Sequence, residues 1–274
     1  MDAIMHPDIV IPLIGSGIKS YTLFTVLGAL IFAAVALPLL RRAGVKPLQA
    51  LALIVAMAVT FLIGARLWNV AVNPGAYGGA LKWHSFKLAG FSLYGGVLGA
   101  ALALLVWARL AQARLLHLLD AIVLPSALAF ALARVGCFLN GCCYGVPTHT
   151  ALGMEFPLKS GAQEIFASLV PISVLSLPTK RYPTQLFELA LALLGIIPAL
   201  AVGRRLKQGS GFMLYGVWFS MARLAVLPLR SLPYDDIVTN AVYPALYLTL
   251  TALGAAALIS INKRRQDNEK IRGI

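Results

Sequence analysis

The sequence predicts an all-α, polytopic membrane protein with about seven transmembrane helices. Its 274 residues are 59% hydrophobic and only 12% charged, with a mean hydropathy of +0.83, whereas ordinary soluble domains carry roughly 25% charged residues. Seven segments are apolar enough to cross a hydrocarbon core of about 30 Å, which takes roughly 20 helical residues. Barrel-like alternation is absent from these segments, and an isolated strand would leave its backbone unpaired in lipid, so each span is expected to be a helix.

The seven expected spans take up most of the chain. In order they are residues 20–40, 49–72, 91–111, 118–140, 184–203, 211–230 and 238–261. We expect one integral membrane domain over residues 1–274. An N-terminal segment (1–19) and a loop region (141–183) are expected outside, and a basic tail (262–274) in the cytoplasm. The first residues lack the basic region of a secretory signal peptide, so we expect them to remain in the mature protein.

Basic residues between the spans predict the orientation of the chain. Thirteen lysines and arginines follow the first, third, fifth and seventh spans, and seven lie on the other side. Because cytoplasmic connections are enriched in Lys and Arg, this asymmetry predicts an external N-terminus and a cytoplasmic C-terminus. The same rule accounts for the net charge of +13, which in a soluble chain would indicate nucleic-acid binding. No nucleic-acid partner is therefore expected.

Three arginines fall inside the spans, each in the later part of a span that runs outward. They are Arg66, Arg134 and Arg223. An arginine at mid-span costs roughly 2.5 to 3.5 kcal/mol on insertion scales, so these side chains need partners. They either snorkel or pair with a carboxylate, for which Glu188 is the credible candidate, or they bind an external anion. Because the planar guanidinium suits phosphate, a phospholipid head group is the favoured ligand.

Two polar segments are expected at the same outer level. Tyr94, Gly95 and Gly96 open the third span, where the glycines either pack helices together or free backbone donors near a ligand. Gln185 and Glu188 are three residues apart and share a face of the fifth span. Gln185 and Glu188 either cap the helix and form an ion pair, or they take part in the reaction.

Three cysteines are clustered within seven residues near the outer surface. They are Cys137, Cys142 and Cys143. An oxidising compartment keeps disulfides stable, so we expect a disulfide with one remaining thiol, or simply buried small side chains. A zinc site with His149 lacks a suitable spacing and a fourth ligand. The rival enzyme class is a membrane thiol-redox protein, but the sequence contains no recognisable quinone or haem motif. We expect neither a metal nor a cofactor.

Several motifs, taken in order and spacing, point to a family. They are "MHP" near the start, "SYTLFTVLGAL" with Tyr21, "IGARLWNV", "LYGGVLG", "ARVGCFLNGCCYGVPT", "RYPTQLFE" and "ARLAVLPLR". Over nearly its whole length the chain resembles the prolipoprotein diacylglyceryl transferases, which are seven-helix enzymes of the bacterial inner membrane with an external N-terminus. The resemblance implies a multi-pass protein of the cytoplasmic membrane.

The resemblance also implies a reaction at the outer face of that membrane. The lipobox cysteine of a prolipoprotein signal peptide attacks phosphatidylglycerol at the glycerol carbon that bears phosphate, a thioether forms, and glycerol phosphate leaves. Arg134 matches the family's signature arginine and Arg223 its late arginine, so both are expected to stabilise the charge of the leaving phosphate. The implied partners are phosphatidylglycerol, prolipoproteins and membrane lipids.

Departures from the family pattern leave the activation of the thiol open. Tyr94 stands where many members have a histidine, and an unperturbed pKa of about 10 makes tyrosine a poor general base. Glu188 is the nearest substitute base. Cys137 and Cys142 stand where asparagine and glutamate are common.

The expected site combines residues from the buried-charge analysis and from the resemblance. The expected catalytic residues are Arg134, Arg223, Tyr94 and Glu188. The expected substrate-binding residues are Tyr21, Arg66, Gly95, Gly96, Asn140, Gly141, Gly145 and Gln185. The alternative function is a diverged, non-catalytic family member that binds anionic phospholipid or lipoprotein.

Overall fold

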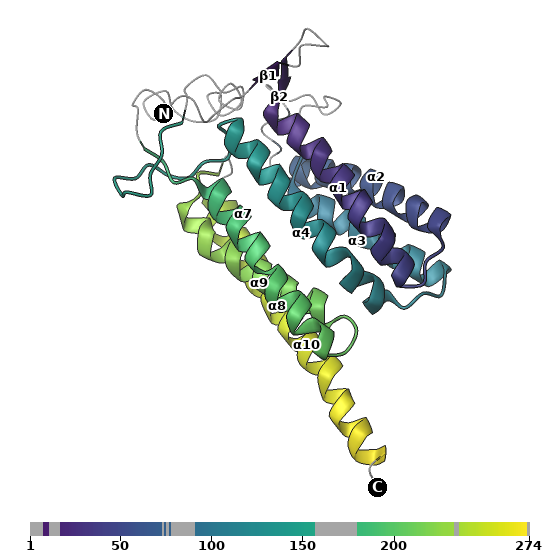
Figure 1. The fold of residues 1–274 in the computed structure, drawn as a ribbon. Coiled ribbons are helices and arrows are strands. Elements are labelled where there is room, and N and C mark those ends of the chain that lie inside the picture. Colours follow the sequence, from purple (N-terminus) through teal and green to yellow (C-terminus); the bar gives the residue numbers. More distant parts are fainter. Residues whose placement is uncertain are drawn as a thin grey trace.

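The computed structural model shows a bundle of long helices (Figure 1). It describes residues 8–10, 17–72, 74, 77, 91–156, 180–232 and 236–272. Within these residues, seven helical segments are long and apolar enough to cross a membrane, which confirms the predicted class. They are α1 (Ser20–Arg42), α2 (Pro47–Val72), α3 (Leu93–Leu110), α4 (Leu115–Leu139), α7 (Thr184–Leu194) with α8 (Ile196–Ala201), α9 (Ser210–Val226) with the 3-10 turn η4 (Leu227–Leu229), and the π-helical turn η5 (Val238–Val242) with α10 (Tyr243–Arg272). The direction of insertion stays a prediction.

Short elements depart from the simple picture of unbroken spans. The segment before the first span contains two antiparallel three-residue strands, β1 (Asp8–Val10) and β2 (Gly17–Lys19). The fifth span is divided between α7 and α8 and continues into the 3-10 turn η3 (Gly203–Arg205). Pro198 accounts for the division, because it has no backbone N–H to donate to the carbonyl of Leu194 one turn earlier.

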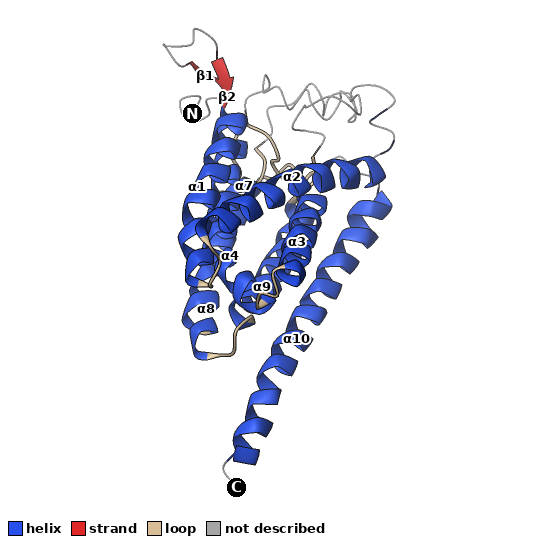
Figure 2. Ribbon diagram, turned by 90° about the vertical axis from the view of Figure 1, so that its right-hand side faces the viewer, coloured by secondary structure: helices blue, strands red, loops and turns tan. Residues whose placement is uncertain are grey.

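The long helices pack in pairs. Helix α1 packs along α4 and α2 along α3, while α9 packs along α10 (Figure 1). Contacts between α4 and α7 join the first four helices to the rest of the bundle. The C-terminal part of α10 extends beyond the other helices (Figure 1 and Figure 2). The junction between α4, α7 and α9 therefore lies inside the bundle.

Glycines bring α2 and α3 into close contact. A Cβ atom added at Gly95 would lie 2.1 Å from the carbonyl oxygen of Gly64, and one at Gly99 would lie 2.1 Å from that of Thr60. Both distances are far below van der Waals contact, so a larger residue would push the helices apart. Small residues serve this purpose at many helix contacts in membranes.

An apolar core fills the end of the bundle near the α1–α2 and α3–α4 connections. Its buried residues are Ala36, Leu40, Val45, Ala50, Leu53, Ile54, Met57, Leu104, Ala108, Leu118 and Ile122. Outward-facing leucines are left uncovered: Leu30, Leu48 and Leu110 are between 62 and 82% exposed. Lipid tails are as apolar as leucine, so a membrane-spanning bundle can present such side chains on its surface.

The loop after α4 is tied to two distant segments at the opposite end of the bundle. Isolated β-bridges join Gly145 to Arg230 and Pro147 to Arg181. The N–H of Gly145 also donates to the carbonyl of Tyr182 at 2.8 Å. These contacts hold the end of α4, the start of α7 and the end of η4 together, where the buried charged residues lie.

Candidate functional site

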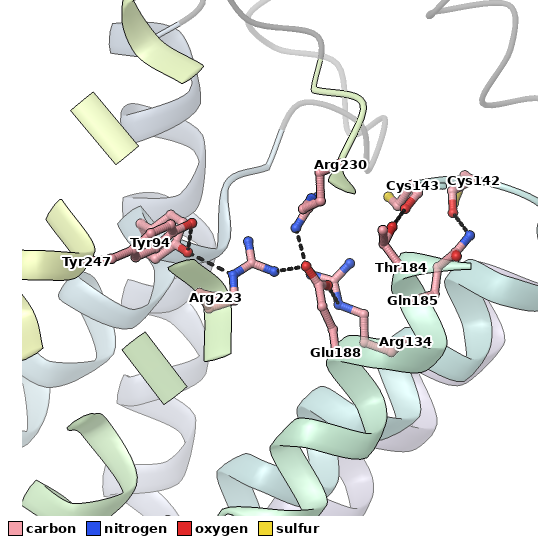
Figure 3. Close-up of polar contacts among 10 residues, drawn as sticks. All are labelled: Tyr94, Arg134, Cys142, Cys143, Thr184, Gln185, Glu188, Arg223, Arg230 and Tyr247. Atoms are coloured by element: carbon pink, nitrogen blue, oxygen red, sulfur yellow. Dashed lines mark hydrogen bonds and ion pairs between the residues drawn. The ribbon is translucent and has the colours of Figure 1, made fainter. Parts of the chain in front are cut away.

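One carboxylate contacts three arginines at the centre of the candidate site (Figure 3). Glu188 Oε2 lies 2.8 Å from Nε of Arg134, and its Oε1 lies 2.6 Å from Nη1 of Arg230. Nη1 of Arg223 donates to the same Oε1. The side chain of Glu188 is 3% exposed and those of the arginines between 8 and 11%. Water therefore screens these charges only weakly.

The members of this cluster come from three parts of the chain. Arg134 lies near the end of α4, Glu188 in the second turn of α7, and Arg223 near the end of α9. Arg230 follows η4 directly. The guanidinium of Arg134 also lies over the ring of Phe130, 4.8 Å from its centroid, which adds a cation–π contact from the previous helical turn.

The cluster carries more positive than negative charge. In the described part of the chain, Glu188 is the one carboxylate that pairs with the three arginines. Nε of Arg134 makes its ion pair without hydrogen-bond geometry, and Nε of Arg230 is buried without a hydrogen-bond acceptor among the described residues. Each buried polar group left unsatisfied costs roughly 1 to 3 kcal/mol or more, so an anionic ligand with several acceptors is favoured here.

Arg223 extends the cluster to a pair of phenols. Its Nε donates to Oη of Tyr94 at 3.0 Å, and that hydroxyl donates to Oη of Tyr247 at 2.5 Å (Figure 3). Tyr247 belongs to α10, is buried, and stacks on Tyr243 one turn earlier. The phenol pair therefore links α3, α9 and α10 and places Tyr94 at the edge of the arginine cluster.

Two side chains at the start of α7 hold the cysteine loop. Thr184 Oγ1 donates to the carbonyl of Cys143 at 2.9 Å, and Gln185 Nε2 donates to that of Cys142 at 2.6 Å (Figure 3). Gln185 is fully buried, and its Oε1 has no hydrogen-bond donor among the described residues. The structure thus gives Gln185 a supporting contact with the loop, and its contact with substrate stays a prediction.

The three cysteines converge as free thiols, so the structure corrects the expectation of a disulfide and fits the alternative of buried small side chains for Cys137 and Cys142. The Sγ atoms of Cys137, Cys142 and Cys143 all lie within 4.8 Å of one another. Gly141 and Cys143 have positive φ angles of 65° and 63°. The chain therefore turns back after α4 and brings all three thiols together, a proximity that sequence spacing alone does not reveal. His149 is exposed and is not part of this group, so the alternative of a zinc site that includes it is not supported.

Electrostatic interactions connect Cys143 to the arginines. Hydrogen bonds from the thiols of Cys137 and Cys142 and the positive charges of Arg134 and Arg230 hold the pKa of Cys143 well below its ordinary value, although burial acts in the opposite direction. Arg134 and Arg230 therefore act on both Glu188 and this thiol.

Of the predicted residues Tyr21 and Arg66, only Tyr21 lies near the charged cluster, where it interacts electrostatically with the three cysteines and with Arg134. Tyr21 is the second residue of α1 and packs against α4, where a Cβ at Gly136 would lie 3.3 Å from the Cα of Tyr21. Arg66 is half-buried, with its guanidinium 5.0 Å from the ring centroid of Tyr77 and 5.4 Å from that of Phe91. Arg66 is not among the arginines that contact Glu188. Of the three intramembrane arginines expected from the sequence, the structure therefore brings together Arg134 and Arg223.

The predicted glycines and Asn140 lie in tight backbone environments. A Cβ at Gly96 would lie 2.6 Å from a ring carbon of Phe61 in α2. A Cβ at Gly95 would lie against the backbone of Gly64 in the same helix. Helix packing therefore accounts for both. A Cβ at Gly145 would lie 2.2 Å from a carbonyl oxygen of η4. Asn140 follows α4 directly and is buried, and its Oδ1 has no hydrogen-bond donor among the described residues, while Gly141 makes the turn that follows. Substrate contacts for these residues stay predictions.

Three residues of the site were not expected from the sequence. The sequence places Arg230 among the basic residues between the spans, but in the structure it forms an ion pair with Glu188. Its spacing of seven residues from Arg223, two helical turns, is a signal that places both on one face. Tyr247 and Thr184 carry no comparable signal, because one is a tyrosine in an apolar span and the other an ordinary residue of a helix start.

A small cavity lies beside the ion pair of Glu188 and Arg223. Its other lining residues are apolar: Phe130, Leu191, Ala192, Phe219 and Ala222. Its volume of about 10 Å³ gives room for about one water molecule, so it is a packing gap beside the charged cluster and not a lipid-sized pocket.

Known proteins resemble this chain over most of its length. A family model described as prolipoprotein diacylglyceryl transferase matches residues 8–262. The phosphatidylglycerol–prolipoprotein diacylglyceryl transferase 2 of Clostridium perfringens is 30% identical over 187 residues, which are 66% of this chain and 67% of that protein. The corresponding transferase of Clostridium tetani is 32% identical over 149 residues (54% and 55% of the two chains), and that of Bifidobacterium adolescentis 26% over 216 residues (76% and 64%). The matched segments thus span from about half to two thirds of these relatives' lengths.

Proposed function

This chain belongs to the prolipoprotein diacylglyceryl transferase family, and we propose that it transfers a diacylglyceryl group from phosphatidylglycerol to the lipobox cysteine of a prolipoprotein. The names of its relatives support this donor and acceptor. The observation that carries the proposal is the buried excess of positive charge formed by Arg134, Arg223 and Arg230 around Glu188. Such a cluster suits the phosphate of an anionic head group.

The arginines contribute to the proposed reaction by stabilising the leaving group. The lipobox thiolate attacks the glycerol carbon that bears phosphate, a C–S bond forms, and the C–O bond breaks. Glycerol phosphate leaves with the electron pair of that bond, so negative charge grows on its oxygen. Guanidinium groups that are already fixed in place stabilise this charge without having to reorganise, which lowers the barrier.

Glu188 keeps the arginines in place. Three like charges so close together repel one another, and the carboxylate offsets that repulsion. Both of its oxygens already contact guanidinium groups. This arrangement favours a positioning role for Glu188 over its alternative role as the base that deprotonates the thiol.

Tyr94 is proposed to act by hydrogen bonding and not as a general base, because the ordinary pKa of a phenol is about 10. Its hydroxyl accepts a hydrogen bond from Arg223 and donates one to Tyr247, so it adjoins the proposed phosphate-binding groups. A phenol in this place can contact the attacking thiol or the leaving oxygen. The phenol pair would also keep the oxygen of Tyr94 oriented toward Arg223.

A second candidate function is non-catalytic binding of anionic phospholipid or lipoprotein. The observation that favours it is the replacement of residues common in the family by Tyr94, Cys137 and Cys142. The arginine cluster would bind phosphate equally well in a protein that has lost turnover.

A labelled-lipid assay separates the two functions. Purified protein is incubated with phosphatidylglycerol labelled in the head group and with a lipobox peptide, and the release of glycerol phosphate is measured. A transferase releases label only when the peptide is present and carries its cysteine, and a peptide with serine in that position is the matched control. Lipid binding without release would establish the binding module. Complementation of a strain depleted of its own transferase tests the same activity in cells.

We place the site at the outer face of the bacterial cytoplasmic membrane, with the N-terminus outside. The asymmetry of basic residues between the spans supports this orientation. A reporter fused after Arg264 is expected to read cytoplasmic, and one inserted near Thr148 is expected to read external. Detection of both on one side would overturn the orientation.

A further inference from the structure

We propose that Cys137, Cys142 and Cys143 form a three-thiolate binding site for a soft monovalent metal ion of the Cu(I) class. Their sulfur atoms all lie within 4.8 Å of one another. Three sulfurs bound in a plane at about 2.3 Å from one ion lie about 4.0 Å apart. The thiols thus need to move inward by only a fraction of an ångström each to coordinate such an ion.

The loop that carries the thiols is held by groups outside it. Cys143 has the rare left-handed conformation, with a φ of 63°. Thr184 and Gln185 donate to the carbonyls of Cys143 and Cys142, which fixes both peptide units against the start of α7. Cys137 belongs to the rigid last turn of α4. Ligands on supported backbone pay little ordering entropy on binding, as an effective metal site requires.

The donor set favours a three-coordinate soft ion. Thiolate sulfur selects Cu(I), zinc and related ions over hard oxygen-seeking cations. Structural zinc takes four protein ligands. In the part of the chain that the structure describes, the cysteine cluster offers three, because His149 is exposed and lies outside it. A monovalent soft ion is satisfied by three sulfurs and needs no further protein ligand.

The charge of the loaded site complements its neighbours. The thiol protons leave to solvent when the ion binds, and three thiolates around one monovalent cation then carry two net negative charges. The arginines around Glu188 carry two positive charges beyond the one that the carboxylate balances, and Arg134 and Arg230 both interact with the Cys143 side chain. Binding of the ion would therefore stabilise the outer end of the bundle.

The site would be a property of this chain rather than of its family. The resemblance implies asparagine and glutamate at the positions of Cys137 and Cys142 in many family members, so those members would lack this set of three thiols. The proposal replaces the sequence expectation of no metal, and it stands whether or not the chain transfers lipid.

The test is a Cu(I) titration of purified, reduced protein without oxygen, against bicinchoninate as a coloured competing chelator. We expect one tightly bound equivalent, with three sulfur neighbours in the copper X-ray absorption spectrum. Each of Cys137→Ser, Cys142→Ser and Cys143→Ser should weaken binding at least about 100-fold. His149→Ala is the matched control and should bind like the wild type.

A second measurement needs no variant, so it is independent of any folding defect. Saturating Cu(I) should raise the thermal unfolding midpoint of the wild-type protein, because the ion binds the folded site. Size-exclusion profiles and circular dichroism check that each serine variant is folded. An unchanged midpoint, a sulfur count of two, equal binding by a folded triple-serine variant, or a preference for Zn(II) with a fourth, non-sulfur ligand would each overturn the proposal.

Discussion

The two ends of the bundle are stabilised by different kinds of contact. Near the α1–α2 and α3–α4 connections the interior is apolar, with residues such as Leu53 and Leu104 fully buried. At the opposite end the interior holds Glu188 with its arginines and phenols. Apolar packing tolerates substitutions that keep volume. A buried ion cluster does not tolerate the loss of one partner, which leaves an uncompensated charge. We therefore expect function to be sensitive at the charged end, where the loss of a partner also lowers stability, and stability alone to be sensitive at the apolar end.

Substitution of Arg134 should give the largest effect. Arg134→Lys keeps the charge but loses the fork that forms two parallel hydrogen bonds to phosphate, so it should be impaired almost as badly as Arg134→Ala. A contact worth about 3 to 4 kcal/mol in the transition state corresponds to a loss of two to three orders of magnitude. The loss should appear in turnover rather than in lipid affinity.

The measurement is the initial rate against lipid concentration for variants of matched thermal stability. Arg109→Lys is the control, because Arg109 is exposed at the far end of α3. Near-normal turnover by Arg134→Lys would remove the phosphate-fork explanation. It would also remove the functional difference between the two ends.

Substitution of Leu53 should lower stability and leave turnover nearly unchanged. Leu53 is fully buried in the apolar core, so Leu53→Ala is expected to lower the free energy of unfolding by about 3 kcal/mol through lost contacts and a residual cavity. Turnover per folded molecule should stay close to that of the wild type. Unfolding in matched detergent measures the first quantity, and Leu110→Ala, at an 82% exposed position, is the control. A large loss of turnover with intact stability would show that the two ends are coupled.

The apolar end was predictable from sequence, and the charged end only in part. Hydropathy and length locate all seven spans, because each span has to satisfy the same requirement for about 20 apolar residues. Arg134, Arg223 and Glu188 stand out for a similar reason, since charge inside a span is costly. Their convergence on one carboxylate depends on how α4, α7 and α9 pack, which no local pattern encodes.

Other features of the charged end depend on local backbone geometry. The approach of the three thiols follows from positive φ angles at Gly141 and Cys143. Tyr247 contributes through its place beside Tyr94, one residue on α10 and the other on α3. Sequence spacing predicts neighbours along one helix but not partners from different helices.

The phenol pair should contribute less than the arginines. Tyr94→Phe removes the acceptor for Arg223 Nε and is expected to lower turnover about tenfold, which corresponds to one net hydrogen bond of roughly 1.4 kcal/mol. Tyr247→Phe should have a smaller effect, because Arg223 keeps its contact with Tyr94. A double-mutant cycle on turnover measures the coupling. Equal losses in the two single variants would show that the pair acts as a unit.

The smallest expected effect is a displaced pH profile at Cys143. Iodoacetamide reacts with the thiolate, so its rate follows the fraction deprotonated. An ordinary thiol has a pKa of about 8.5, and the lowered pKa of Cys143 follows from hydrogen bonds from Cys137 and Cys142 and from nearby arginine charges. Reactivity should therefore persist below the ordinary midpoint and disappear only as the pH falls through the lowered pKa.

Peptide mass spectrometry of reduced, metal-free protein measures this rate at Cys143 separately from the two buried thiols. Cys137→Ala removes the leading hydrogen-bond donor, so the midpoint should move upward toward that of an ordinary thiol. Cys143→Ser is the control for labelling elsewhere. A wild-type midpoint at or above about 8.5 would show that the arginines and thiols do not stabilise the Cys143 thiolate. The positive charges of the arginines would then stabilise only Glu188 and the anionic ligand, and not the Cys143 thiolate.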